Sequence, residues 1–372
     1  MPGGVGALIG GRYLLSGSAG QSGTGRVWRA RDEMLGRDVA VEEVLLPPQS
    51  PAEHAELLAR TIAAARAAAR LEHPGVVTIY DVVEADDAPW IVMPLVSGSS
   101  LSAEVASRGP LPWERAARIG GQVADALAYA HGAGIAHGDL KPDDILLTGA
   151  SGDHAVVADF GIARSLDATA ELAGAGMRVG SVHYLAPEQL EDGQVGPPAD
   201  RWALGAVLYY ATEGRPPFTG STTTAVMAAV LTRRLTLPGH AGPLRAPIES
   251  LLSKDPAARP DARSVATALA AALASPATSE PAPAAGPAPA AEPAPAAGAA
   301  GHAALTGPRR EVPFTAALAA AARSNPRLAV GAVTAIAMVV ALILVVTLFS
   351  PSAHRPESPG RLPASPGHSA PP

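Results

Sequence analysis

Four short motifs follow one another between residues 137 and 205. They are HGDLKPDDILL at 137–147, ADFGIAR at 158–164, YLAPE at 184–188 and DRWALG at 200–205. Each of them occurs by chance in unrelated proteins, so none is informative alone. In this order and at this spacing they are specific. No other feature of the chain limits its fold as strongly.

Together the motifs resemble those of the eukaryotic-like (Hanks-type) serine/threonine protein kinases of actinobacteria, over residues 12 to about 272. The resemblance implies an α+β, bilobal protein-kinase fold, with a strand-rich N-lobe at about 12–95 and a helical C-lobe at about 96–272. It also implies ATP-dependent phosphoryl transfer to serine or threonine of a protein substrate that the sequence does not identify.

The pattern of apolar residues and turn signals agrees with two such lobes. It predicts strands near 12–16, 25–30, 37–45, 76–84 and 89–94, with a helix at about 52–71 between the third and the fourth. Beyond them it predicts mostly helices, at 100–107, 112–133, 200–213, 221–232 and 244–253.

The stretch GQSGTGRV at 20–27 resembles the glycine-rich loop of these kinases, whose backbone amides approach the phosphates of ATP. Without the resemblance, a Gly-rich β-turn would be the better interpretation. Ser22 stands where the family has its middle glycine. The resemblance places the nucleotide contacts on this loop and on the third strand, at Gly20, Ser22, Gly23, Gly25, Val27, Ala40 and Glu42.

Glu42 is the largest departure from the family. The third strand of these kinases reads VAIK or VAVK, and its lysine holds the α- and β-phosphates, but here VAV at 39–41 is followed by Glu42. The partner glutamate of that lysine lies nine residues before the His of an HP pair, and counting back from His73 reaches Ala64. At an effective dielectric constant near 20, each unit charge pair about 4 Å apart is worth roughly 4 kcal/mol. A carboxylate at this position therefore opposes the phosphates strongly.

Arginine is the only other cation available in the N-lobe, because Lys141 and Lys254 are the only lysines of the chain. Strand alternation points Arg26 away from the adenine side, and Arg29 lies further along the strand. Neither replaces the missing lysine convincingly.

Two other roles for Glu42 remain open. Its carboxylate is a suitable ligand for magnesium, or it turns away and pairs with Arg60 or Arg66 of the following helix. Since neither restores a cation to the phosphates, we expect the binding of ATP with Mg²⁺ or Mn²⁺ to be weakened.

The catalytic loop largely matches the family. Asp139 is the expected catalytic base, which accepts the proton of the substrate hydroxyl, and Lys141 is typical of serine/threonine kinases. Asp144 replaces the metal-binding asparagine, a tolerable change because a carboxylate also ligates magnesium, and Asp159 is the expected principal metal ligand. Ser181 matches the residue that positions the substrate ahead of the YLAPE motif.

Activation by phosphorylation of the segment after Asp159 is not expected. Gly138 stands where many family members have an arginine that binds the phosphorylated loop, so a phosphate on Thr169 would lack this partner.

The structural signatures of the C-lobe are all present. Glu188 and Arg259 match a buried carboxylate–arginine pair, and Asp200 and Trp202 match the helix that braces the catalytic loop. The helical lobe is thus expected to fold normally, whereas the nucleotide clamp departs from the family.

The last hundred residues differ in character from the rest. Residues 276–300 are Pro/Ala-rich, and we expect a disordered linker over 276–327. Residues 328–349 carry no charge, and as a helix they would be about 33 Å long, enough to cross a bilayer once. The excess of arginine on the N-terminal flank predicts a cytoplasmic kinase domain, a single-pass anchor in the cell membrane and a short, disordered tail at 350–372.

Composition excludes several other functions. The chain has no cysteine, so it holds neither a disulfide nor a thiolate metal site. Its net charge is −6 and it has no dense basic block, which argues against a nucleic-acid partner. Nothing in the sequence demands a homodimer or excludes one.

Two main hypotheses of function remain, and a third is weaker. The first is a pseudokinase, in which signalling or scaffolding replaces phosphoryl transfer because Glu42 and Ala64 replace the Lys–Glu pair. The second is an active serine/threonine kinase that relies on Asp139 and Asp159. A membrane receptor for outside signals is the weakest, since the tail is short.

Overall fold

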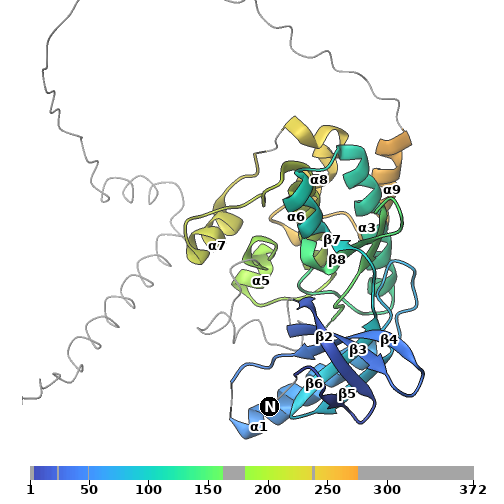
Figure 1. The fold of residues 1–372 in the computed structure, drawn as a ribbon. Coiled ribbons are helices and arrows are strands. Elements are labelled where there is room, and N and C mark those ends of the chain that lie inside the picture. The colour runs from blue at the N-terminus through green and yellow to red at the C-terminus, as the bar shows by residue number, and fades with distance from the viewer. Residues whose placement is uncertain (1–3, 23–24, 49, 162–180, 237–238, 275–372) are drawn as a thin grey trace, which may run out of the picture. The chain divides into compact units, whose positions relative to one another are not determined.

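The computed structural model describes residues 4–22, 25–48, 50–161, 181–236 and 239–274. Within these ranges the chain forms two lobes, seen in Figure 1 as a blue group of strands with one helix and a green-to-orange group of helices. The predicted α+β, bilobal kinase fold is confirmed for this part of the chain.

The N-lobe is one antiparallel sheet with the strand order β1-β2-β3-β4-β6-β5. Its strands are β1 Leu8–Ile9, β2 Tyr13–Gln21, β3 Gly25–Asp32, β4 Arg37–Val44, β5 Asp81–Ala85 and β6 Ala88–Pro94. The central strand β4 is covered on both faces. Val39 and Val41 pack with Tyr13 and Trp90 on one side, and Ala40 and Val44 pack against the cluster on the other side.

Helix α1 (Pro51–Ala68) supplies part of that second cluster through Ala65. Its start is defined by the sequence: Pro51 occupies the first helical position, and the Glu53 carboxylate accepts from the Ser50 hydroxyl (2.6 Å) and the Ser50 amide (3.1 Å). Figure 1 shows α1 alongside the sheet.

The C-lobe is built mainly of helices around one large apolar core. Its α-helices are α2 Leu101–Arg108, α3 Trp113–Gly132, α5 Pro187–Glu191, α6 Pro197–Glu213, α7 Thr223–Thr232, α8 Arg245–Leu251 and α9 Ala262–Ala274. Its strands are β7 Ser99–Ser100, β8 Ile145–Thr148 and β9 His154–Val157. Short 3-10 helices, labelled η, are η1 Pro142–Asp144, η3 Ser181–His183, η4 Gly239–Leu244 and η5 Pro256–Ala258. The C-lobe also contains a small sheet with the order β7-β8-β9. The catalytic loop, residues 136–141, has no regular secondary structure and continues through η1 into β8.

One predicted strand is wrong over its first half. The segment 76–84 reads as one apolar run, but β5 begins only at Asp81. Residues 76 and 77 instead contact the C-lobe: the Val77 amide donates to the Val157 carbonyl (2.9 Å), and the Val157 amide donates to the Gly75 carbonyl (2.8 Å). A partner distant in sequence takes these backbone groups away from the N-lobe sheet. The sequence also did not predict β1, β7, β8, β9, α5 and α9.

Within the described ranges, no helix has both the length and the apolar character needed to cross a bilayer. The predicted linker at 276–327, transmembrane helix at 328–349 and tail at 350–372 all lie outside the described residues.

Candidate functional site

The catalytic loop is held by one buried carboxylate at the start of α6. Asp200, which is 1% exposed, accepts from the backbone amides of His137 and Gly138 at 2.8 Å each and from Nε2 of His131 at 2.7 Å. Hydrogen bonds to a charged acceptor are among the stronger ones in proteins. The predicted bracing role of Asp200 is therefore confirmed, and Trp202 lies fully buried two residues further along α6.

Gly138 adopts a left-handed backbone conformation, with φ of 89°. Its carbonyl accepts from Nε2 of Gln189 (2.9 Å), which follows the YLAPE motif directly. Neither Gln189 nor His131 was expected at the site, because nothing in their local sequence tells which loop they reach.

Lys141 lies between the two acids of the loop. Its Nζ donates to Oδ2 of Asp139 at 2.9 Å and to Oδ2 of Asp144 at 3.0 Å. Burial by itself would lower the pKa of Lys141, but the charges of Asp144 and Asp139 outweigh it, so that the pKa lies above the usual value for lysine. The ammonium is thus permanently charged and keeps Asp139 oriented.

Asp144 and Asp159 are desolvated acids that repel each other. Burial raises the pKa of Asp144 well above its usual range, and Lys141 offsets this only in part because Asp159 and Asp139 add negative charge. Burial, followed by the negative charge of Glu42, likewise raises the pKa of Asp159. Asp159 also has a positive φ of 61°, which is uncommon outside glycine and directs its carboxyl into the site.

These two carboxyl groups suit a hard divalent cation, since such an ion would offset their repulsion. Among the described residues, however, no three acids or histidines converge closely enough to hold a metal by themselves. A magnesium ion at Asp144 and Asp159 would therefore complete its coordination with water or with oxygen atoms of a bound phosphate, as is usual for this ion.

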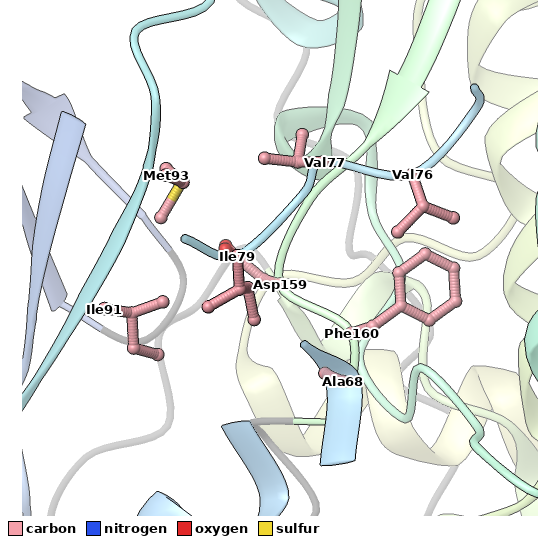
Figure 2. Close-up of a pocket in the computed structure, with 8 residues that line it drawn as sticks. All are labelled: Ala68, Val76, Val77, Ile79, Ile91, Met93, Asp159 and Phe160. Carbon is pink, nitrogen blue, oxygen red and sulfur yellow. The ribbon is translucent and has the colours of Figure 1, made fainter. Parts of the chain in front are cut away.

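Phe160 and Asp159 both line a small pocket, whose other lining residues are apolar. Figure 2 shows Phe160 directed toward Val76, with Ile91 and Met93 from β6 across the pocket and Ala68 from the end of α1. The ring also packs on His137, with centroids 4.9 Å apart. Burial lowers the pKa of His137, and its Nε2 donates to the Ala158 carbonyl (2.9 Å), so the neutral imidazole fixes the loop against the strand end.

Glu42 is fully buried in the middle of β4, at 0% exposure. It is paired across the sheet with Val27 of β3 and Ile91 of β6. The Ser22 hydroxyl donates a hydrogen bond to Oε1 of Glu42, and a hydrogen bond with Glu42 contributes to the raised pKa of Asp159. A carboxylate thus stands between the glycine-rich loop and the expected metal ligand.

The basic side chains considered for Glu42 are all more exposed to solvent than Glu42 is. Arg60 and Arg66 on α1 are both exposed, as are Arg26 and Arg29 on β3. That neither β3 arginine replaces the lysine stays a prediction. On α1, Ala64 is half-buried and has no polar group to offer.

The neighbouring Glu43 has a separate role on the opposite face of the strand. It is 4% exposed, and Nε1 of Trp28 donates to its Oε2 at 3.3 Å. Buried acids at successive positions of one strand therefore need different partners.

The remaining predicted nucleotide residues fall into two groups. Val27 and Ala40 belong to the apolar cluster with Met93 and Ile91, as expected of a surface for a flat base. Gly20 has a positive φ of 150°, and a Cβ on Gly25 would lie 1.8 Å from the Glu43 carbonyl oxygen, so the hairpin requires glycine there. Gly23 lies outside the described residues.

Two further predictions concern the C-lobe. Ser181 begins η3, and its carbonyl accepts from the Tyr184 amide (3.0 Å). Glu188 and Arg259 form the predicted buried pair through two hydrogen bonds, Nη1–Oε1 at 2.6 Å and Nη2–Oε2 at 2.8 Å. Thr169 lies outside the described residues.

Comparison with known sequences settles the family. Residues 13–269 match the protein kinase domain. The chain belongs to the protein kinase family. Members of this family in general use ATP with Mg²⁺ or Mn²⁺.

Several bacterial serine/threonine protein kinases are similar to this family member. PknA of Mycobacterium tuberculosis is 36% identical over 262 residues, which are 68% of this chain and 59% of PknA. PkaA of Streptomyces coelicolor is 35% identical over 271 residues, 70% of this chain and 50% of PkaA. PrkC of Bacillus subtilis is 37% identical over 225 residues, 60% of this chain and 33% of PrkC. The chain thus spans between 33% and 59% of the length of these relatives.

Proposed function

We propose that this protein is a kinase-family member with impaired phosphoryl transfer, which acts in signalling or as a scaffold at the membrane. The observation that carries the proposal is Glu42: the position that normally presents a cation to the nucleotide phosphates holds a fully buried carboxylate hydrogen-bonded to Ser22.

Charge is the main physical reason. Asp159 and Asp144 already repel each other, and Glu42 adds a third acid, whereas Lys141, the cation of the catalytic loop, is engaged by Asp139 and Asp144. A nucleotide triphosphate would bring further negative charge into this desolvated site, where each close pair costs several kcal/mol. Magnesium bound by Asp144 and Asp159 would neutralise part of that charge and orient the phosphates, but an acid would still stand where the family has its lysine.

The second candidate function is an active kinase, and the catalytic loop favours it. Asp139 is held by Lys141, and Asp200 fixes the loop that carries it. In phosphoryl transfer the protein contributes mainly positioning and charge stabilisation. A correctly placed base would therefore retain some rate even without the phosphate-binding lysine.

Phosphotransfer by the purified full chain decides between these two functions. The reaction contains labelled ATP, Mg²⁺ or Mn²⁺ and a generic basic acceptor protein, and Asp139→Asn serves as the inactive control. We expect no labelling above the level of the control from folded protein. Labelling that disappears in Asp139→Asn would show that Glu42 is tolerated and that the protein is an active kinase.

The affinity for nucleotide tests the physical cause directly. Since Glu42→Gln removes the charge and keeps the side-chain size, we expect the affinity for Mg-ADP, measured by calorimetry, to rise at least tenfold. Glu42→Lys combined with Ala64→Glu restores the Lys–Glu ion pair of the family and should raise the affinity for Mg-ADP further. Glu43→Gln changes an acid on the opposite face of the same strand and is the matched control. Equal effects of Glu42→Gln and Glu43→Gln would contradict the proposal.

We further propose that residues 328–349 anchor the protein in the cell membrane, with the kinase domain on the cytoplasmic side. The support is the uncharged apolar run and the arginine-rich flank before it. A protein substrate or regulatory partner would then be found at that surface.

A further inference from the structure

The two ends of the glycine-rich hairpin are joined by hydrogen bonds that include the Ser22 side chain. The Ser22 amide donates to the Gly25 carbonyl at 3.0 Å, and the Gly25 amide donates to Oγ of Ser22 at 2.9 Å. The hydroxyl of Ser22 in turn donates to the carboxylate of Glu42. The result is a relay from backbone amide to hydroxyl to carboxylate.

Backbone amides of a glycine-rich turn are the usual donors to an anionic phosphate, because they carry partial positive charge and lie close to the ligand. Here the amide of Gly25 already has an acceptor, and that acceptor leads to a buried negative charge. Through Ser22, the Glu42 carboxylate therefore gives the loop an anionic acceptor, as a bound phosphate would.

We propose that the Glu42 carboxylate takes the place of a phosphate as the anion bound by the glycine-rich loop. The Ser22 hydroxyl connects the loop to this carboxylate. In this arrangement Ser22 is a positioning residue: it ties the loop to β4 and occupies the Gly25 amide. The inference rests on the proposed function in one respect only, namely that Glu42 does not hold nucleotide phosphates, and it adds that Ser22 sustains this state.

The geometry of the sheet supports the assignment. β2 carries irregularities between Leu15 and Gly17 and between Ser18 and Gly20, which shift the register ahead of Ser22. Across β3, Glu42 pairs with Val27, and Gly25 approaches β4 so closely that a Cβ would meet the Glu43 carbonyl. The bulges and this close approach bring a hydroxyl twenty residues away in sequence onto Glu42.

Amide hydrogen exchange at Gly25 in the full chain without nucleotide tests the relay. We expect Ser22→Ala to accelerate exchange of the Gly25 amide at least tenfold, because its side-chain acceptor is removed. Ser16→Ala is the matched control, since Ser16 lies on β2, the strand that leads into Ser22, but its hydroxyl donates to the Arg29 carbonyl (3.1 Å). Unchanged exchange at Gly25 in Ser22→Ala would overturn the proposal.

The link to Glu42 is tested by a double-mutant cycle read by the same measurement. If Glu42 anchors the relay, the effect of Ser22→Ala should fall from at least tenfold to less than threefold in a Glu42→Leu background, because leucine offers no acceptor to the Ser22 hydroxyl. An equal effect in both backgrounds would show that Ser22 caps Gly25 independently of Glu42 and would overturn the proposal.

The two proposals fail separately. If Glu42→Gln leaves the affinity for Mg-ADP unchanged while Ser22 and Glu42 still couple in the exchange cycle, the account of impaired nucleotide binding is wrong and the relay stands. If the affinity rises but no coupling is found, the relay is wrong and the impairment comes from charge alone.

Discussion

At the scale of single residues, the chain shows two ways of burying a carboxylate. Asp32 is fully buried and fully paired: Arg12 donates through Nε to Oδ1 and through Nη2 to Oδ2, both at 2.8 Å. Glu42 is equally buried but lies next to another acid, Asp159. The first arrangement stabilises the folded chain, whereas the second is typical of a functional site, because it is costly unless a ligand or a proton compensates it.

The paired carboxylate predicts a dependence of stability on pH. The hydrogen bonds from Arg12 and the amides of Leu35 and Met34 lower the pKa of Asp32 from 3.8 to about 2, although burial opposes them. Between these two values the unfolded chain binds more protons than the folded chain, so the stabilisation by Asp32 is present above pH 3.8 and is lost as the pH falls toward about 2.

We therefore expect the difference in free energy of unfolding between wild type and Asp32→Asn to shrink when the pH is lowered from about 5 to about 2.5. Urea unfolding at both pH values measures it. Asp38→Asn is the control, because the Asp38–Arg31 pair is exposed on both sides. A difference between wild type and Asp32→Asn that stays constant over this range would contradict the assignment.

At the scale of elements, the C-lobe depends on close contacts between helices. Gly205 lies in the buried helix α6, and a Cβ there would come within 2.7 Å of Cβ of Leu251 at the end of α8. Gly121 lies in α3, and a Cβ there would meet nothing within 4 Å. The same substitution should therefore have opposite effects at the two positions.

We expect Gly205→Ala to lower the free energy of unfolding by about 1–3 kcal/mol through overpacking. Gly121→Ala should raise it by about 0.5–1 kcal/mol, since alanine is the better helix former and has room. Chemical denaturation of both variants provides the measurement. Stabilisation by Gly205→Ala would mean that α6 and α8 are not packed as closely as described.

At the scale of the whole molecule, the contacts that fix the catalytic loop and the altered nucleotide clamp lie in different lobes. The loop with Asp139 is fixed by Asp200, and Glu188 binds Arg259, all within the C-lobe. The changes at Ser22, Glu42 and Ala64 all belong to the N-lobe. Because each lobe folds around its own core, substitutions in the N-lobe leave the architecture of the C-lobe intact.

The proposed membrane anchor also belongs to the scale of the whole molecule. Because residues 328–349 are proposed as the anchor, we expect the full chain to sediment with membranes and to require detergent for extraction. Deletion of 328–349 should move it to the soluble fraction, whereas deletion of the tail 350–372 should not. A full chain that stays soluble without detergent would contradict the anchor.

Much of the fold and of the catalytic loop followed from the sequence alone. Asp139, Lys141, Asp144 and Asp159 were identified through the family resemblance that the order and spacing of the motifs carry, and the structure places Lys141 against Asp139 and Asp144. The helix start at Pro51 and most strands were also predictable, because caps, turns and apolar periodicity are local signals.

The sequence by itself determined which residue types stand at the clamp: an acid at 42, an alanine at 64 and a serine at 22. Only the tertiary structure decided where Glu42 points and what it binds. Strand alternation gives the two faces of β4, but it cannot identify the partner when both faces are buried. The partners of Glu42 are Ser22, which an irregular hairpin brings close, and Asp159 from the other lobe. Both are distant from Glu42 in sequence, and such contacts leave no local pattern from which they could be predicted.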